Sequence, residues 1–203
     1  MLARKLHKAS SSAPGPAGRA TVPSMRVVAG LAGGRRLKAP AGRRVRPTSE
    51  RVREALFNSL GSLDAVAGAT VLDLFAGTGA LGIEALSRGA SSATFVDADV
   101  EAVRAIRDNL AATGLAERAR VVHADVFRFL SDAPPEPVDV AFADPPYAFD
   151  DWPRLLAVLP ARLVAIEART HVALAPGWRA LRSKRYGDTV VTLARFEQDA
   201  EQG

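Results

Sequence analysis

Four consecutive residues, Asp144-Pro145-Pro146-Tyr147, combine a carboxylate, a rigid backbone and an aromatic ring. They follow the apolar run Val138–Ala143, which predicts a buried strand of a parallel sheet. Ligands of open α/β sheets bind at the carboxyl ends of such strands. Because proline has no N–H and disfavours helix, the carbonyls of Asp144 and Pro145 can accept hydrogen bonds. The combination suits a planar group that carries an NH2, although Asp and Pro are also common in ordinary turns.

A glycine-rich segment earlier in the chain has the spacing of a nucleotide-binding turn. Gly77, Gly79 and Gly82 form the pattern G-x-G-x-x-G, and Asp97 lies 20 residues after Gly77. Glycines let the backbone approach a ligand closely, and the carboxylate can bind ribose hydroxyls. This pattern alone fits a nicotinamide dinucleotide as well as S-adenosylmethionine.

Two further carboxylates favour S-adenosylmethionine as the cofactor. Asp73 lies close to the glycine turn, where an anion disfavours a pyrophosphate and suits a cationic methionyl group. Asp125 follows another predicted strand, where it could bind an adenine amino group or cap the next helix. With this methyl donor, Asp144 and Pro145 would orient an amine, Tyr147 would stack on its base, and catalysis would be mostly positioning. Such a reaction requires no metal ion.

Charge is distributed unevenly along the 203 residues. Residues 1–53 hold 13 Lys and Arg against one acid, whereas residues 54–203 hold 14 against 21 Asp and Glu. A basic front end on an acidic body is typical of a protein that binds a polyanion. We therefore expect nucleic acid to contact the basic residues that flank structured sequence, namely Arg26, Arg35, Arg36, Lys38, Arg43, Arg44, Arg46, Arg51 and Arg53.

Composition indicates a soluble globular protein and a cytoplasmic location. Hydrophobic residues make up 48% of the chain and charged residues 24%. No apolar run approaches the roughly 20 residues that a membrane span needs. The chain has no Cys, which excludes disulfides and thiolate metal sites. Residues 1–24 lack the apolar core of a secretory signal, and their Ser, Ala, Pro and Gly content predicts a disordered tail.

The remaining chain predicts a small hairpin followed by one α/β domain. Strands at 25–29 and 35–39 form the hairpin, and 43–47 is a basic linker, so residues 25–47 make one unit and residues 48–203 the main domain. Thr48 or Ser49 is expected to cap a helix that ends at Gly61.

From residue 70 onward, strands and helices alternate, which predicts a mostly parallel sheet with helices on both faces. Strands are expected at 70–75, 93–96, 120–123, 138–143 and 163–167, and helices at 79–87, 100–113, 126–130 and 152–159. Period-two alternation at 178–184 and 189–196 predicts that the sheet, seven-stranded in all, ends in an antiparallel hairpin.

Four stretches of the chain, residues 26–30, 46–58, 73–90 and 144–147, resemble the RsmD family of small-subunit ribosomal RNA guanine-N2 methyltransferases. The block Arg-Pro-Thr-Ser-Glu-Arg-Val-Arg-Glu at 46–54 is the most specific, whereas many amino-methyltransferases share the other motifs. The resemblance implies a Rossmann-like, S-adenosylmethionine-dependent domain with an N-terminal β-hairpin. It also implies methylation of the N2 amine of one guanine in 16S rRNA of the small ribosomal subunit, and we expect a monomer.

The family's motif positions imply roles for individual residues. The methionine side of the cofactor would be contacted by Asp73, Gly77 and Gly79, the ribose by Asp97 and the adenine by Asp125. The guanine would be held by Asp144, Pro145 and Tyr147.

Three other functions compete with this one. An adenine or cytosine amino-methyltransferase acting on DNA or RNA would share the motifs, but the chain has no obvious separate target-recognition domain. A non-catalytic RNA-binding module could retain the fold, although the intact motifs argue against it. A nicotinamide oxidoreductase would need a proton donor, and the sequence does not supply one.

Overall fold

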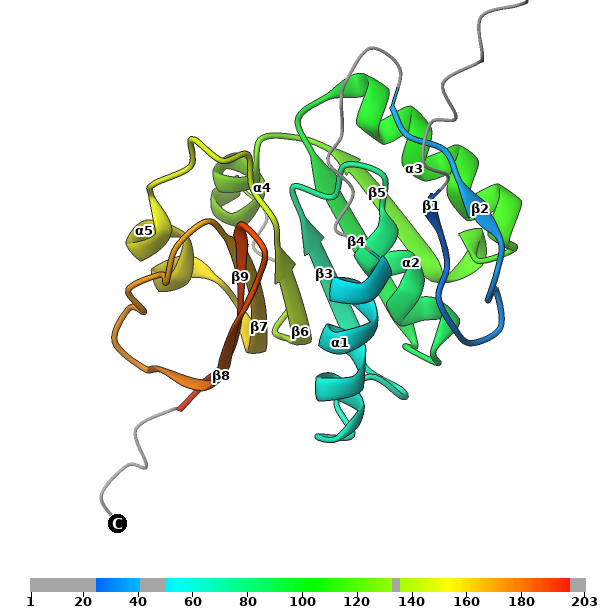
Figure 1. The fold of residues 1–203 in the computed structure, drawn as a ribbon. Helices are drawn as coiled ribbons and strands as arrows, with labels where there is room; N and C mark the ends of the chain where they lie inside the picture. Colours follow the sequence, from blue (N-terminus) through cyan, green and yellow to red (C-terminus); the bar gives the residue numbers. More distant parts are fainter. Residues whose placement is uncertain (1–24, 41–49, 133–135, 198–203) are drawn as a thin grey trace, which may run out of the picture.

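A seven-stranded sheet forms the centre of the computed structural model, which describes residues 25–40, 50–132 and 136–197. The strand order is β5-β4-β3-β6-β7-β9-β8 (Figure 1). The strands that pair in parallel are β3 (Thr70–Leu74), β4 (Ser92–Asp97), β5 (Ala119–His123), β6 (Val138–Ala143) and β7 (Ala161–Ala168). The two that pair antiparallel are β8 (Trp178–Tyr186) and β9 (Thr189–Phe196). The predicted mostly parallel sheet with a terminal antiparallel hairpin is confirmed.

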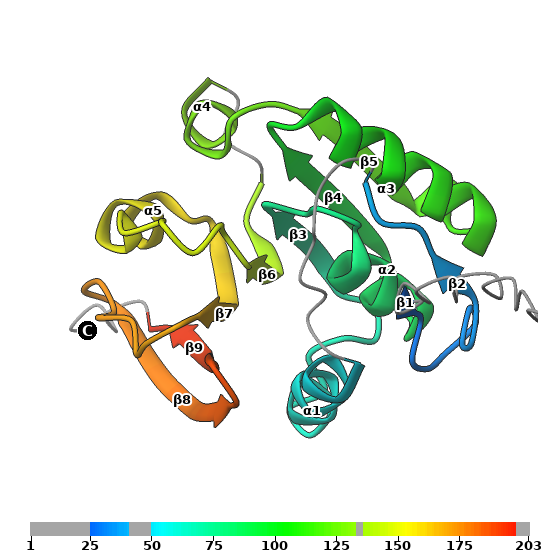
Figure 2. The ribbon, with the colours of Figure 1, turned by 45° about the horizontal axis from the view of Figure 1, so that its top comes forward.

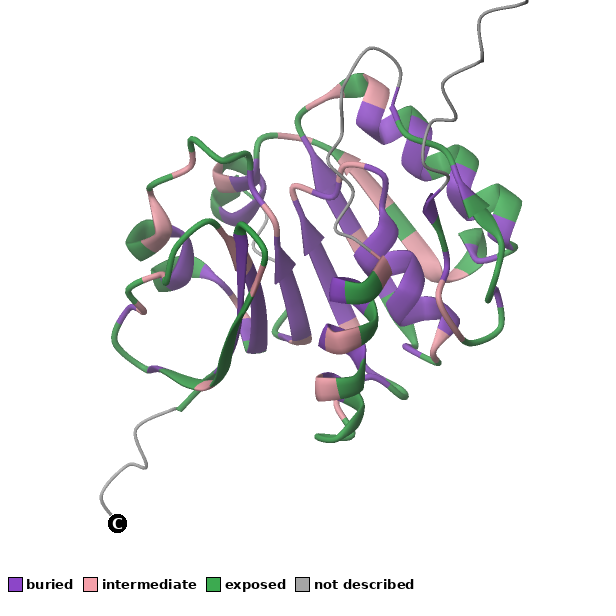
Figure 3. Cartoon of the chain, viewed as in Figure 1, coloured by how far each residue is buried: buried purple, intermediate pink, exposed green. Residues whose placement is uncertain are grey.

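Helices cover both faces of this sheet (Figure 2). One face packs against α1 (Glu50–Gly61), α2 (Ala80–Ser87) and α3 (Val100–Thr113), and the other against α4 (Val126–Asp132) and α5 (Trp152–Val158). A short 3-10 turn, Ala116–Arg118, follows α3. Figure 3 shows the central strands as buried, which explains their continuous apolar sequences. No helix within the described ranges is long and apolar enough to cross a membrane.

Local sequence signals set several helix ends. Asp99 caps α3 by accepting a hydrogen bond from the backbone N–H of Glu101 at 2.8 Å. Gly114 ends the same helix with φ of 73°, as the sequence predicts. Gly61 is the last residue of α1, again as predicted. The cap expected at Thr48 or Ser49 lies outside the described residues.

The predicted N-terminal hairpin is present, but its strands are shorter than expected. They are β1 (Met25–Arg26) and β2 (Arg36–Leu37), paired antiparallel. Beyond β1, the backbone N–H groups of Val28 and Ala29 donate to the carboxylate of Glu84, at 2.7 and 3.0 Å, instead of to β2. The hairpin is therefore attached to α2 through a side chain.

Glu84 is the centre of a buried ionic cluster. Its carboxylate pairs with the guanidinium groups of Arg53, at 3.4 Å, and Arg88, at 2.7 Å. Arg53 also donates to the backbone carbonyl of Arg26. Burial lowers the pKa of Arg53, and the nearby Glu84 carboxylate opposes this shift. The cluster joins the hairpin, α1 and α2 around one carboxylate.

Arg53 therefore corrects one sequence prediction. Its side chain has no solvent exposure, so it cannot reach an RNA phosphate in this structure. The physical reason is helical periodicity: residue 53 lies on the same side of α1 as Phe57 and Leu60, which face the core. A basic residue on this face is buried even though the surrounding sequence is strongly basic.

A second side chain attaches the other end of the hairpin near the glycine loop. Asn109 of α3 accepts from the backbone N–H of Lys38 at 2.8 Å and donates to the carbonyls of Lys38 and Thr78, at 3.0 and 2.9 Å. The described part of the predicted 25–47 unit is therefore packed against the main domain. The expected tail, residues 1–24, and the linker, residues 43–47, lie outside the described residues.

Candidate active site

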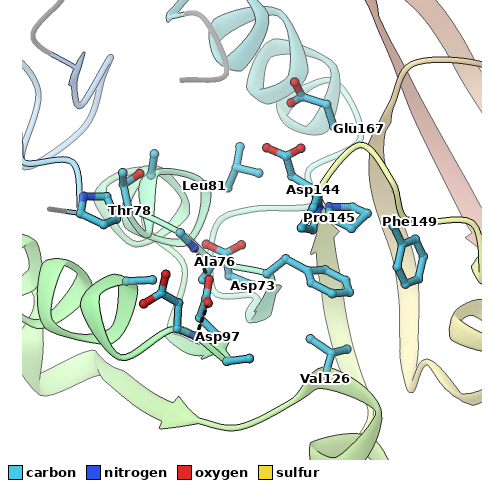
Figure 4. Close-up of a pocket in the computed structure, with 18 of the residues that line it drawn as sticks. Asp73, Ala76, Thr78, Leu81, Asp97, Val126, Asp144, Pro145, Phe149 and Glu167 are labelled. Carbon is cyan, nitrogen blue, oxygen red and sulfur yellow. Dashed lines mark hydrogen bonds between the residues drawn. The ribbon is translucent and has the colours of Figure 1, made fainter. Parts of the chain in front are cut away.

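A cavity of about 1090 Å³ opens at the carboxyl ends of the parallel strands (Figure 4). Its lining includes all but one of the predicted cofactor- and base-binding residues, namely Asp73, Gly77, Asp97, Asp125, Asp144, Pro145 and Tyr147. The exception is Gly79, which has φ of 74° and directly precedes α2. The structure thus brings together motifs that are up to about 70 residues apart in the sequence. The cavity is large enough for a nucleoside cofactor and a second planar group.

After β3, the backbone requires glycine at particular positions of the loop and of α2. Gly77 has φ of 57°, and its N–H donates to the Asp97 carboxylate at 2.8 Å. A Cβ on Gly82 would lie 2.3 Å from the ring of Phe95, so only glycine permits this close packing of α2. Phe75 also has a positive φ, 56°, a strained conformation for a bulky residue that is concentrated at functional sites.

Asp73 lies at the bottom of this loop and is 2% exposed. One carboxylate oxygen accepts the backbone N–H of Gly82 at 2.9 Å. Burial raises the pKa of Asp73 well above its usual range, and the carboxylates of Asp144 and Asp97 raise it further, against the opposing effect of the Gly82 N–H. A cation bound here would relieve this accumulation of negative charge.

Asp97 and Asp125 use part of their hydrogen-bonding capacity within the protein. The two oxygens of Asp97 accept from the N–H groups of Gly77 and Asp99, at 2.8 and 2.9 Å. Asp125 accepts from the N–H of Arg128 at 3.0 Å, which confirms its expected role as a helix cap. Because each carboxylate oxygen has two lone pairs, both residues can still accept from a ligand.

The Asp144–Tyr147 turn forms the opposite wall of the cavity. Asp144 is half-buried, Pro145 is buried, and Tyr147 is 46% exposed. The guanidinium carbon of Arg169 lies 4.2 Å from the centre of the Tyr147 ring. A hydrogen bond of 2.8 Å from the N–H of Phe149 to the carbonyl of Pro146 closes the turn.

Aromatic side chains outside the predicted site residues also line the cavity or support its wall. Phe149 contacts Phe75 and Trp152, with ring centres 5.3 and 5.0 Å apart. Phe75 and Phe149 line the cavity itself. Their flat rings offer an apolar surface for a nucleobase. Phe149 follows Tyr147 by only two residues, so the Asp-Pro-Pro-Tyr motif is a sequence signal for an aromatic ring near the cavity.

The basic residues predicted to contact RNA divide into three groups. Arg26, Arg35, Arg36, Lys38 and Arg51 are exposed, Arg53 is buried, and Arg43, Arg44 and Arg46 lie outside the described residues. Arg26 and Arg36 are register partners in the hairpin, so two like charges lie side by side. Arg26 pairs with Glu50 at 3.1 Å, and Lys38 with Asp108 at 3.6 Å. Such exposed pairs contribute little to stability and can exchange for phosphate contacts.

The parallel sheet, the glycine loop after β3 and the Asp-Pro-Pro-Tyr turn after β6 together define a Rossmann-like methyltransferase. The family model described as "Conserved hypothetical protein 95" matches residues 25–195, and the chain belongs to this family.

Curated relatives are similar over most of the described domain. Over 137 residues the chain is 42% identical to "Putative rRNA methyltransferase YlbH" of Bacillus subtilis, which covers 66% of this chain and 73% of that protein. Over 174 residues it is 33% identical to "Ribosomal RNA small subunit methyltransferase D" of Haemophilus influenzae, which covers 80% of this chain and 89% of that protein. These matches confirm the resemblance to the RsmD family.

A solved structure supports the fold assignment. "Putative methyltransferase yhhF from Escherichia coli" superposes with a TM-score of 0.76 at 33% identity. The match covers 87% of this chain and 99% of that chain. The predicted Rossmann-like methyltransferase fold is therefore confirmed.

Proposed function

We propose that this protein transfers a methyl group from S-adenosylmethionine to the N2 amine of a guanine in small-subunit (16S) ribosomal RNA. One observation carries the proposal: the acidic glycine-loop site and the Asp144–Tyr147 turn open into the same cavity. The names of the curated relatives support ribosomal RNA as the substrate. In this proposal the protein acts as a monomer in the cytoplasm.

The residues around the glycine loop fit S-adenosylmethionine. Asp73 would face the cationic methionyl end, because burial and the carboxylates of Asp144 and Asp97 raise its pKa and a cation would favour its ionised form. Gly77 and Gly79 allow the backbone to turn beneath the ligand. Asp97 would accept hydrogen bonds from the ribose, and Asp125 from the adenine amine. When bound, the cofactor supplies an electrophilic methyl group on a sulfonium.

The guanine amine would be held by the Asp144–Tyr147 turn. The lone pair of this amine is conjugated with the ring, which makes it a poor nucleophile. Hydrogen bonds from its two N–H groups to the Asp144 carboxylate and the Pro145 carbonyl would orient it and raise its electron density. The amine nitrogen would take the methyl group, the sulfonium would leave as a neutral thioether, and the amine would lose one proton to Asp144 or to water. Positioning of this kind can supply about 7–11 kcal/mol.

The exposed basic residues of the hairpin and α1 would bind the RNA backbone. A base in a loop is the expected target, since extruding it costs less than unstacking a base pair. Tyr147 would stack on the extruded base, together with the cavity-lining rings of Phe75 and Phe149.

The proposal is tested by combining a cofactor titration with a transfer assay. We expect the purified protein to bind S-adenosylmethionine and to label ribosomal RNA, or small subunits, from cells that lack the protein. Subunits from cells that contain the protein serve as the control, because their site is already methylated. Binding without transfer would indicate a non-catalytic module, and transfer to DNA alone would indicate a different methyltransferase.

Binding to RNA should weaken steeply with salt. If the five exposed cations Arg26, Arg35, Arg36, Lys38 and Arg51 each neutralise a phosphate, affinity should fall about a hundredfold between 50 and 200 mM salt. Arg36→Gln should reduce the slope of log affinity against log salt by about one. Arg128→Gln, an exposed arginine on the opposite face of the sheet, is the control and should leave the slope unchanged. A flat salt dependence would exclude a phosphate-binding front end.

Cofactor affinity should depend on pH through Asp73. The raised pKa of Asp73 in the free protein would be lowered by a cationic ligand, so binding releases a proton. Affinity should therefore rise as the pH increases from about 4, the ordinary carboxyl range, to the raised pKa of Asp73, and then level off. Calorimetry in two buffers of different ionisation enthalpy measures the released proton. Asp73→Asn should remove this release; the same release in the variant would assign it to another group.

A further inference from the structure

We propose that Glu167 selects guanine over adenine and cytosine by accepting the ring N1–H beside the target amine. This inference rests on the proposed function and adds a specificity-determining residue to it. Glu167 lies near the end of β7, is half-buried and lines the cavity.

The register of the sheet places Glu167 beside Asp144. Ala143 of β6 pairs with Ile166 of β7, so Asp144 and Glu167 are the next residues along two neighbouring parallel strands. Such strands lie about 4.8 Å apart. Figure 4 shows both carboxylates at the same end of the cavity, with Glu167 beyond Asp144 as seen from the glycine loop.

The two side chains also share one face of the sheet. Phe142 and Ala165, two residues before them, both pack in the core on the α1 side. Side chains alternate along a strand, so residues 144 and 167 point to that same side. A guanine whose amine is held by Asp144 would, in this proposal, turn N1, one of the two ring nitrogens beside that amine, toward Glu167.

The chemistry of the bases makes this second carboxylate selective. Guanine has two ring nitrogens beside its C2 amine, of which N1 carries a hydrogen and N3 is an acceptor, whereas the one ring nitrogen beside the amine of adenine or cytosine is an acceptor. An ionised carboxylate only accepts hydrogen bonds. It therefore attracts the N1–H of guanine and repels the lone pair of the other two bases, which combines a favourable contact with a penalty against the wrong base. Asp144 alone holds an amine and does not make this distinction.

The test compares guanine with 2-aminopurine at the target position. 2-Aminopurine keeps the amine at C2, but its N1 is an acceptor. The substrates are ribosomal RNA that carries either base at the target position and small subunits reconstituted from it. Methyl transfer to each base is measured as kcat/KM for the wild type, Glu167→Gln and Glu167→Ala. Glu197→Gln, an exposed glutamate outside the cavity, is the control.

We expect the wild type and Glu197→Gln to prefer guanine strongly. Glu167→Gln should lose about 10- to 100-fold in kcat/KM for guanine. For 2-aminopurine, kcat/KM of Glu167→Gln should fall less than for guanine, or rise, because the amide N–H of glutamine can donate to N1 of this base. The guanine preference should thus fall by at least about tenfold in Glu167→Gln. The cofactor affinity of each variant, measured by calorimetry, should equal that of the wild type. This result would show that the variants are folded.

Two results would overturn the inference while leaving the proposed function intact. One is an unchanged guanine preference in Glu167→Gln. The other is an equal decrease in kcat/KM for guanine and 2-aminopurine in Glu167→Gln, which would indicate that Glu167 has a purely structural role. If the wild type methylates neither substrate at the amine, the proposed function itself fails, and the inference fails with it.

Discussion

Asp144→Ala is expected to lower kcat for methyl transfer by about a hundredfold to a thousandfold, the usual cost of removing one hydrogen-bonding group at a transition state. Asp144 would hold the reacting amine, so its removal leaves the nucleophile without orientation. Cofactor affinity should change little, because the groups at the glycine loop remain. Single-turnover transfer to small subunits, together with a cofactor titration, measures both quantities.

Two further variants make this result specific. Asp144→Asn keeps a carbonyl acceptor in the same place and should retain intermediate activity. Asp150→Ala removes an exposed carboxylate from the same loop and should retain nearly full activity. Near-normal turnover in Asp144→Ala would contradict the mechanism.

Glu84→Ala is expected to destabilise the fold by about 3–5 kcal/mol, the usual cost of breaking a buried ion pair. Arg53 has no solvent exposure and would keep a buried charge without its carboxylate. The backbone N–H groups of Val28 and Ala29 would lose their acceptor as well. Thermal unfolding followed by circular dichroism should show a decrease in Tm of about 6–20 °C.

The exposed pair Arg128–Asp132 provides a matched control for this prediction. Like Arg88–Glu84, it links an arginine and an acid four residues apart, but its side chains are 79% and 64% exposed. Asp132→Ala should change stability by less than about 0.5 kcal/mol. Equal losses of stability in Glu84→Ala and Asp132→Ala would show that burial does not determine the contribution of the Glu84 cluster.

The main elements of the fold were predictable because their signals are local. The helix Val100–Thr113 has its cap and its stop glycine within the sequence that forms it, and its predicted bounds agree with the structure. The hairpin strands were overestimated because a side chain 55 residues away accepts the N–H of Ala29. Sequence patterns do not show a contact of that range.

The candidate site was predictable to the extent that its residues lie in motifs at strand ends. Asp73, Asp97 and Asp144 follow this rule, and the structure brings them to one cavity. Arg53 was misassigned because charge counting does not distinguish the buried face of a helix from its exposed face. Glu167 is not recognisable from the sequence, because its position beside Asp144 depends on the register between β6 and β7, which the sequence does not specify.

Mapping the modified base is a direct test of guanine-N2 methylation by this protein. Small subunits from cells lacking the protein are incubated with the protein and labelled S-adenosylmethionine, and the RNA is digested to nucleosides and to sequence-assigned fragments. We expect a single labelled nucleoside, N2-methylguanosine, at one position of the small-subunit RNA. Label on an adenine or cytosine amine, or no label in the RNA at all, would exclude this activity.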